Sequence, residues 1–295
     1  MVVQLLFASL AVAGRFVLPH VPAGTLVTFR VLGATAVLLG AQVATGGSWI
    51  RSRHDLLRLA VLGLLGIAAN QTLFLYGLQH TTAINATILV TTVPVFTVLG
   101  SVLTGREQAS SAMAIGIALA AGGAVYLIGP DRISLAPDVA LGNGLIVLGM
   151  MCYAAYFVYS KEVFRRYGSV TVSFYVMLFA CVGVIPFGLA AQRDLDPASI
   201  GPTVWWWVAY IVVFPTICTY LLNIWALQRV SSNLVAVYIY LQPLFAAAIA
   251  PLVLPGEEIT LRMVLSGLAI FTGLGLVIWS ERRRHGEIPI EPVGE

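Results

Sequence analysis

Charged side chains are scarce in this chain: only 10% of its 295 residues are Asp, Glu, Lys or Arg, whereas 59% are hydrophobic and the mean hydropathy is +0.92. A soluble globular domain carries roughly a quarter charged residues. The composition therefore excludes a soluble globule and predicts an all-α polytopic membrane protein. The net charge of +3 comes from basic residues in loops, which indicates membrane topology and not a nucleic-acid partner.

Acidic and imidazole side chains are missing where the chain is most apolar. None of the thirteen Asp and Glu residues lies in the middle of a predicted membrane span, and the four His residues fall in loops or in the C-terminal tail. Glu162, the nearest, stands beside Lys161 at a membrane edge. The spans thus lack a group that could carry a proton or neutralise a cationic drug.

Catalytic and metal-binding motifs are absent as well. The chain has no HExxH, no GxSxG and no pair of Asp residues within a span, so we do not expect an enzyme. Its three cysteines, Cys152, Cys181 and Cys218, lie within apolar runs without CxxC spacing. We interpret them as small buried packing residues and expect neither a metal nor another cofactor.

Long apolar runs are what the chain does have. At roughly 20 residues per span, they predict ten transmembrane helices, near residues 2–19, 23–44, 56–77, 82–103, 110–128, 141–160, 170–191, 204–226, 232–254 and 261–280. The first run could instead be a cleaved signal peptide, because Ala11-Val12-Ala13 resembles a peptidase site. No Lys or Arg precedes the run, and its removal would leave the first half one helix short, so a helix is favoured.

One stretch of membrane sequence occurs twice. Its first copy contains Gly77-Leu78-Gln79, Pro94, Gly105-Arg106-Glu107, Gly116 and Gly122, and its second contains Ala226-Leu227-Gln228, Pro243, Gly256-Glu257-Glu258, Gly267 and Gly273. Each half holds an odd number of predicted spans, so the second half enters the bilayer upside down, an arrangement typical of transporters. We therefore predict two inverted five-helix repeats, residues 1–128 and 141–281, joined by an external linker at 129–140 and followed by a cytoplasmic tail at 282–295.

Lys and Arg are unevenly divided between the loops of this topology. With a cytoplasmic N-terminus, only Arg132, Arg193 and Arg262 lie outside. The eleven basic residues inside are Arg51, Arg53, Arg58, Arg106, Lys161, Arg165, Arg166, Arg229, Arg282, Arg283 and Arg284. Because cytoplasmic loops carry an excess of basic residues, we predict that both termini are cytoplasmic.

The other two basic residues, Arg15 and Arg30, fall inside predicted spans. A charged side chain at the centre of a membrane helix costs about 2.5–3.5 kcal/mol on insertion scales, so neither should face lipid at depth. For Arg30 we favour a structural role, capping carbonyls or anchoring the first hairpin near the outer surface. For Arg15, which aligns roughly with Lys161 of the second half, packing and lining a substrate path both stay open.

Neutral polar and aromatic side chains gather on helical faces in equivalent spans of the two halves. Interhelical packing would explain any one of them, but their concentration is better explained by a cavity lined from both halves. Pro94 and Pro243 would free backbone carbonyls at matching depths, and we interpret them as hinges. The candidate substrate-binding residues are Asn70, Phe74, Thr87, Thr91, Tyr153, Tyr156, Tyr220, Asn223, Tyr240 and Arg15.

A longer pattern of residues extends over most of the chain. It comprises Pro22, Arg30, Gly77-Leu78-Gln79, Thr81-Thr82-Ala83, Ala86, Pro94, Glu107, Gly116 and Gly122, and it recurs from Leu227. In this pattern the chain resembles the EamA-type exporters of the drug/metabolite transporter superfamily, and among them the bacterial aromatic amino acid exporters. The resemblance implies ten helices in two inverted repeats, a central cavity, alternating access and the cell inner membrane. The chain departs from the family in having Arg15 where Lys is more usual and in lacking an early Trp, which bears on the substrate more than on the fold.

The sequence thus predicts an inner-membrane exporter of small metabolites, with amino acids, and aromatic ones among them, favoured. A neutral cavity of amides, hydroxyls and Tyr rings can bind a zwitterion and stack a ring. Multidrug efflux is the alternative within transport, although it ordinarily requires a buried carboxylate, and nucleotide-sugar transport would need several basic residues. A non-transporting membrane scaffold is the alternative of another class. The expected partners are a small-molecule substrate and the lipid bilayer, and a single chain can form the cavity.

Overall fold

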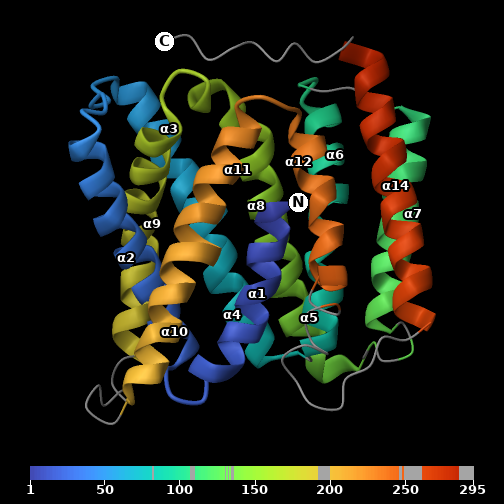
Figure 1. Cartoon of the computed structure of the whole chain (residues 1–295), viewed down its shortest axis with the longest axis horizontal. Helices are drawn as coiled ribbons and strands as arrows, with labels where there is room; N and C mark the ends of the chain where they lie inside the picture. Colours follow the sequence, from blue (N-terminus) through green and yellow to red (C-terminus); the bar gives the residue numbers. More distant parts are fainter. Residues whose placement is uncertain are drawn as a thin grey trace.

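The computed structural model describes residues 1–81, 83–106, 110–129, 131, 133, 136–191, 200–245, 248 and 261–285. Within these residues every regular element is a helix, and the helices stand side by side in one bundle (Figure 1). In chain order they are α1 (Val2–Val17), α2 (Ala23–Ala44), α3 (Arg53–Gly63), η1 (Leu64–Ala69), α4 (Asn70–Gln79), α5 (Ala83–Val90), α6 (Val93–Leu103), α7 (Ser111–Ile128), η3 (Pro137–Val139), α8 (Ala140–Phe164), α9 (Ser169–Ala191), α10 (Pro202–Val212), η6 (Val213–Cys218), α11 (Thr219–Leu227), α12 (Ser232–Val237), η7 (Tyr238–Tyr240) and α14 (Leu261–His285). A helix bundle suits so apolar a chain, because each helix satisfies its own backbone hydrogen bonds.

Eight helices of the described residues are long and apolar enough to cross a membrane. They are Ala23–Ala44, Arg53–Gln79, Asn85–Leu103, Ser111–Ile128, Pro137–Phe164, Ser169–Ala191, Pro202–Leu227 and Leu261–Arg283. The predicted first span corresponds to α1, which has 16 residues, and the predicted ninth to the shorter apolar helix Ser232–Phe245. The remainder of the ninth span, apart from Ala248, lies outside the described residues, as do parts of the predicted linker and tail. Eight of the ten expected spans therefore correspond to full-length helices of the described residues, and the total of ten stays a prediction.

Large apolar side chains cover the outside of the bundle. The exposed fractions of Leu103, Trp206 and Val182 are 85%, 77% and 67%. On a soluble protein a surface of this kind would promote association, whereas hydrocarbon solvates it at no cost. The surface of the bundle therefore agrees with a multi-pass membrane protein.

Two close helix pairs join the two halves of the chain. In the first pair, α2 packs against α9, with Gly24 beside Ala191 at one end. At the other end Thr171 Oγ1 donates a hydrogen bond to Gln42 Oε1 at 2.9 Å. The order of these contacts along the chain means that α2 and α9 run antiparallel. The two helices are the second members of the two predicted repeats.

The second pair is α7 and α14, which lie side by side at the right of Figure 1. A Cβ atom added at Gly116 would lie 2.6 Å from the carbonyl oxygen of Gly273, and one added at Gly123 would lie 3.0 Å from the Cβ of Ala269. Small residues thus let the two backbones approach closely, as they do at many membrane helix crossings. These helices also run antiparallel, and they are the fifth members of the two predicted repeats.

The third and eighth predicted spans share an irregularity at the same register. The α3 helix continues through η1 into α4, and α10 continues through η6 into α11. Both η1 and η6 are π-helical, and they begin 149 positions apart, the separation that also relates Pro94 to Pro243. Pro215, which lacks an N–H group, falls inside η6. A π-helical turn is wider than an α-helical one, so it re-aims the residues that follow.

Both predicted hinge prolines follow a break in a helix. Pro94 occupies the second position of α6, directly after the two-residue turn that ends α5. Pro243 follows η7, a 3₁₀ turn that interrupts the helix begun by α12. Proline is tolerated in the first turn of a helix, where its missing N–H group has no helical partner to lose. The two breaks stand at equivalent positions of the two halves.

Contacts of different chemistry join helices at opposite ends of the bundle. At the end where α3 begins, Glu162 of α8 binds Arg58 at 3.0 Å and Arg106 at 2.8 Å. At the other end the ring of Phe16 on α1 stacks on Trp207 of α10, with 5.0 Å between centroids and 6° between planes. Arg58 and Trp207 are 149 positions apart, and Phe16 and Glu162 are 146 apart, the offset that aligns the first and sixth spans. The ionic contact and the aromatic contact therefore occupy equivalent places.

Candidate functional site

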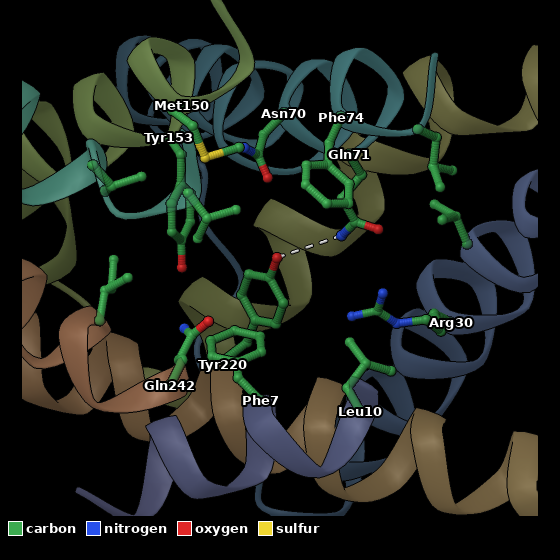
Figure 2. Close-up of a pocket in the computed structure, with 15 residues that line it drawn as sticks. Phe7, Leu10, Arg30, Asn70, Gln71, Phe74, Met150, Tyr153, Tyr220 and Gln242 are labelled. Atoms are coloured by element: carbon green, nitrogen blue, oxygen red, sulfur yellow. Dashed lines mark hydrogen bonds between the residues drawn. The ribbon is translucent and has the colours of Figure 1, made fainter. Parts of the chain in front are cut away.

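A cavity of about 230 Å³ lies between helices of both halves (Figure 2). Most of its lining is apolar, and a few amides, two tyrosines and one arginine supply the polar groups. The lining residues are Phe7, Leu10, Val27, Arg30, Asn70, Gln71, Phe74, Leu75, Val90, Val93, Met150, Tyr153, Tyr220, Ile239 and Gln242. Mostly apolar cavities with a small number of convergent polar groups are the usual form of small-molecule sites.

The two π-helical segments place the polar groups of the cavity. Gln71 follows η1 by two residues and Tyr220 follows η6 by two residues, so the pair stands 149 positions apart. The amide nitrogen of Gln71 donates to the hydroxyl of Tyr220 at 3.5 Å. Equivalent positions of the two halves therefore meet within the cavity.

Two further pairs of lining residues have the same separation. Val90 and Ile239 are 149 positions apart, and so are Val93 and Gln242. Val93 and Gln242 immediately precede Pro94 and Pro243 in the sequence. The proline breaks thus adjoin the cavity wall in both halves, although neither proline is itself a lining residue.

Arg30 of α2 is placed differently from the expectation of a capping residue. Its Nε donates to the hydroxyl oxygen of Thr216 in η6 at 3.0 Å, and that hydroxyl in turn donates to the carbonyl of Ile211 at 2.8 Å. The side chain is 9% exposed, and its terminal nitrogens point into the cavity toward Tyr220 (Figure 2). The chain thus holds a guanidinium inside the bundle, away from the loops.

Four of the residues predicted to bind substrate line this cavity: Asn70, Phe74, Tyr153 and Tyr220. The amide nitrogen of Asn70 donates to the carbonyl of Gly149 at 3.0 Å, which fixes the amide against α8. The hydroxyl of Tyr153 accepts from Asn223 at 3.4 Å. Asn223, also a predicted site residue, is buried behind the wall and orients Tyr153.

The other predicted residues lie away from the cavity. Tyr156 is fully buried against Phe157 and Phe164, and Tyr240 is fully buried in the cluster that joins η7 to α7 and α14. The hydroxyl of Thr91 donates to the carbonyl of Ile88 at 2.6 Å, and Thr87 is exposed. The side chain of Arg15 lies outside the described residues.

The other eleven lining residues were not among the predicted ones. They are Phe7, Leu10, Val27, Arg30, Gln71, Leu75, Val90, Val93, Met150, Ile239 and Gln242. Gln71 and Gln242 carried a usable signal, since an amide within an apolar run is costly unless it has a partner. Nothing in the sequence marks Phe7, Leu10 and Met150 as lining residues, because apolar residues occur on lipid-facing and on cavity-facing surfaces of membrane helices.

The charges of the cavity are one-sided. Among its fifteen lining residues there is one Arg and no Asp, Glu or His. Within the described residues, no group of three His, Cys, Asp or Glu side chains is placed to hold a metal ion. The cavity can therefore bind a neutral or negatively charged group with Arg30, and it offers no counter-charge to a cation.

Comparison with known proteins agrees with this architecture. The model of the EamA-like transporter family matches residues 1–129 and 140–279. An uncharacterized transporter of Archaeoglobus fulgidus is 27% identical over 75% of this chain and 76% of its own length. The uncharacterized transporter YetK of Bacillus subtilis is 26% identical over 83% and 76%, and the WAT1-related protein At3g53210 of Arabidopsis thaliana is 26% identical over 86% and 75%. One crystal structure, 20% identical in sequence, matches with a TM-score of 0.79 over 97% of this chain and 96% of its own, which bears on the fold alone.

Proposed function

The chain belongs to the EamA-like transporter family, and from that premise we propose that it exports small metabolites, amino acids above all, by alternating access. The family and the relatives are transporters, which supports membrane transport of a small solute and gives no support to catalysis. The proposal adds the substrate class, the direction and the mechanism.

The meeting of equivalent residues at the cavity is the observation that carries the mechanism. The pairs Gln71 and Tyr220, Val90 and Ile239, and Val93 and Gln242 each combine one residue from either half. Together with the antiparallel packing of α2 on α9 and of α7 on α14, these pairs support two inverted repeats with the binding site between them. Rocking of one repeat against the other around a fixed site exposes that site to either side in turn.

The size and lining of the cavity support an amino acid as the substrate. Its volume of about 230 Å³ is below the roughly 300–1,000 Å³ typical of sites for drug-sized ligands. The rings of Phe74, Tyr153 and Tyr220 offer faces on which an aromatic side chain could pack. Multidrug efflux fits less well, because the described part of the lining has no carboxylate for a cationic drug.

The positions of the basic loops and of the lining residues bear on the orientation of the protein in the membrane and on its oligomeric state. The predicted inside loops lie at the end of the bundle where α14 finishes (Figure 1), and they carry the basic excess. We therefore infer that this end faces the cytoplasm in the cell inner membrane, and we propose that both termini are cytoplasmic, although α1 begins well inside the height of the bundle (Figure 1). Both halves of the chain contribute to the described lining, so one chain can form the cavity, and we propose a functional monomer on that basis.

Flux through purified protein in liposomes tests the function. We expect net movement of phenylalanine and related amino acids down their gradients, and little movement of organic cations or nucleotide sugars. Tyr220→Ala should reduce the flux by about tenfold or more, since it removes a hydrogen-bonding and stacking group from the cavity. Leu103→Ala, at an exposed site on the outside of the bundle, is the matched control and should leave the flux unchanged. Selective movement of organic cations would favour multidrug efflux, and no movement of any solute would favour a scaffold.

A further inference from the structure

The polar groups of the cavity divide into hydrogen-bond donors and acceptors, and their partners show which is which. Arg30 is always a donor. The described part of the chain supplies its guanidinium with one hydrogen bond, from Nε to Thr216, so the terminal nitrogens remain available. The hydroxyl oxygen of Tyr220 accepts from Gln71, which leaves its proton to be donated. Beside Arg30 the cavity therefore presents donors.

Asn70 presents the opposite polarity. Its amide nitrogen faces the carbonyl of Gly149 at 3.0 Å, and a carbonyl can only accept, so the orientation of the amide is fixed. The Oδ1 atom then points into the cavity (Figure 2), and no described residue donates to it. Gln242, from the other half, donates its amide nitrogen to the amide oxygen of Gln4 at 2.7 Å and directs its own oxygen toward Tyr220 (Figure 2); its partner is an amide, unlike that of Asn70, so the orientation seen in the structure and not the partner's chemistry assigns this oxygen. Two amide oxygens are thus available to accept.

The buried positive charge of Arg30 requires an anionic partner. A buried cation is stable only when it is paired and hydrogen-bonded, and none of the described residues that line this cavity is acidic. The pairing group must therefore enter as a solute. A guanidinium binds a carboxylate through two parallel hydrogen bonds, a geometry that an ammonium ion cannot offer.

From these observations we propose that the cavity recognises both charged ends of a zwitterionic α-amino acid, the carboxylate at Arg30 and Tyr220 and the ammonium at the amide oxygens of Asn70 and Gln242. The assignment rests on the proposed function in taking this cavity as the substrate site. It adds a ranking of the two charged groups of the ligand. The carboxylate is required for binding because it neutralises the buried charge of Arg30, and the ammonium increases the affinity further. In the absence of substrate a small inorganic anion such as chloride occupies the place of the carboxylate.

Calorimetric titration of the purified protein tests the ranking without any need for transport. The ligands are phenylalanine, 3-phenylpropionate, which lacks the ammonium, and 2-phenylethylamine, which lacks the carboxylate. Leucine, 4-methylpentanoate and isoamylamine form a second series in case the cavity prefers an aliphatic side chain. In one series or both we expect the amino acid to bind most tightly, the carboxylate about tenfold more weakly, and the amine at least a hundredfold more weakly.

Two variants separate the two ends of the ligand. Arg30→Gln should abolish the advantage of the carboxylate over the amine. Asn70→Ala should bring the affinity for the amino acid closer to that for the carboxylate, with Gln242 keeping part of the difference, and should leave binding of the carboxylate itself unchanged. Val27→Ala, which alters only the apolar lining, is the control and should affect all three ligands alike. Because Arg30→Gln could fail to fold, the wild-type protein gives a second measurement: replacing gluconate by chloride at constant ionic strength should weaken carboxylate binding.

The proposal is overturned if the amine binds as tightly as the carboxylate in both series, if no compound binds, or if chloride has no effect. An equal loss of all ligands in a folded Arg30→Gln variant would assign that residue to structure. Binding and flux can fail separately. A protein that binds carboxylates but moves none would keep this site and lose the export function, whereas one that moves amines freely would keep transport and lose the site.

Discussion

Single residues decide which side chains reach the cavity. Tyr153 and Tyr156 are one turn of α8 apart, yet the first lines the cavity and the second is sealed in the core. Gly66 explains the difference, because its missing side chain makes room for the ring of Tyr156 against η1. A polar residue in an apolar span is therefore evidence of a buried position, and it becomes evidence of a site only when a cavity adjoins it.

Thiol accessibility separates these two classes of position. We expect single Cys substitutions at Asn70, Tyr153 and Tyr220 to react with a membrane-impermeant thiol reagent in at least one conformation, because these positions line the cavity. Substitutions at Tyr156 and Tyr240 should stay protected, since both side chains are 0% exposed. The measurement uses a background in which the three native cysteines are replaced. Protection at all five positions, in a protein that still transports, would contradict the assignment of the cavity.

The hydroxyl of Tyr156 makes a separate prediction about stability. It is buried, and no described residue hydrogen-bonds to it. A buried unpaired polar group costs about 1–3 kcal/mol, so Tyr156→Phe should leave the free energy of unfolding unchanged or raise it by about 1 kcal/mol. Thermal unfolding in detergent measures the difference.

Tyr167→Phe is the matched comparison. Its hydroxyl donates to Asp55 at 2.8 Å, and this bond raises the pKa of Tyr167, so the hydroxyl stays protonated at neutral pH. Loss of a hydrogen bond to a charged group should lower the free energy of unfolding by about 1.5–3 kcal/mol. If Tyr156→Phe proved the more destabilising of the two, the hydroxyl of Tyr156 would have a hydrogen-bond partner outside the described residues.

At the scale of whole elements, the crossing of α7 and α14 depends on glycine. A Cβ atom added at Gly273 would clash with the carbonyl of Gly116 and lie 2.7 Å from the backbone nitrogen of Ala120, whereas one added at Gly275 would meet nothing within 4 Å. Gly273→Ala should therefore destabilise the protein by about 1–3 kcal/mol. Gly275→Ala should change stability by no more than about 0.5 kcal/mol. Equal unfolding temperatures for the two variants would show that the helices do not pack through Gly273.

The helices themselves were largely predictable, and their local irregularities were not. The apolar runs located every full-length helix, because a span must be long and apolar whatever its neighbours. They could not reveal η1 or η6, since a segment that is apolar on all sides looks the same with α-helical or π-helical turns. The same limit explains why the sequence predicts both Tyr220 and Tyr240 as substrate-binding residues, although of the two only Tyr220 is among the lining residues. The lipid side and the protein side of such a helix carry similar residues.

Arg30 illustrates a different limit. The energetic argument that an arginine in a span avoids lipid holds, since the side chain is buried in protein. The sequence did not indicate which polar neighbour would receive it. Its partner Thr216 lies 186 positions away, within the π-helical segment. Long-range pairing of this kind depends on the packing of the two halves, which no local pattern encodes.

For the molecule as a whole, the absence of titratable acids from the cavity bears on energy coupling. Proton antiport needs a group that binds and releases a proton at the site, and none of the lining residues that the structure describes is Asp, Glu or His. We expect that collapsing the pH gradient across liposomes, at clamped membrane potential, leaves substrate flux nearly unchanged. Accumulation of substrate driven by a pH gradient alone would contradict this expectation. Glu162, held by Arg58 and Arg106 at one end of the bundle, would then be the first suspect.

The two ends of the bundle, one closed by charges and the other by stacked rings, should also respond unequally to dissolved salt. Mobile ions screen exposed charges over a Debye length of about 8 Å at physiological ionic strength and far less in concentrated salt. They screen the contacts of Glu162, whose side chain is 48% exposed, whereas the stacked rings of Phe16 and Trp207 carry no charge to screen. Rising ionic strength should therefore weaken the contacts of Glu162 and leave the stacking of Phe16 on Trp207 unchanged, although the ion pair of Arg262 with Asp131 at the latter end is screened as well. In the proposed alternating access, conformations open at the end of Glu162 should then gain population. The salt content of one compartment would then act on this transporter as a directional signal, with no dedicated binding site for it.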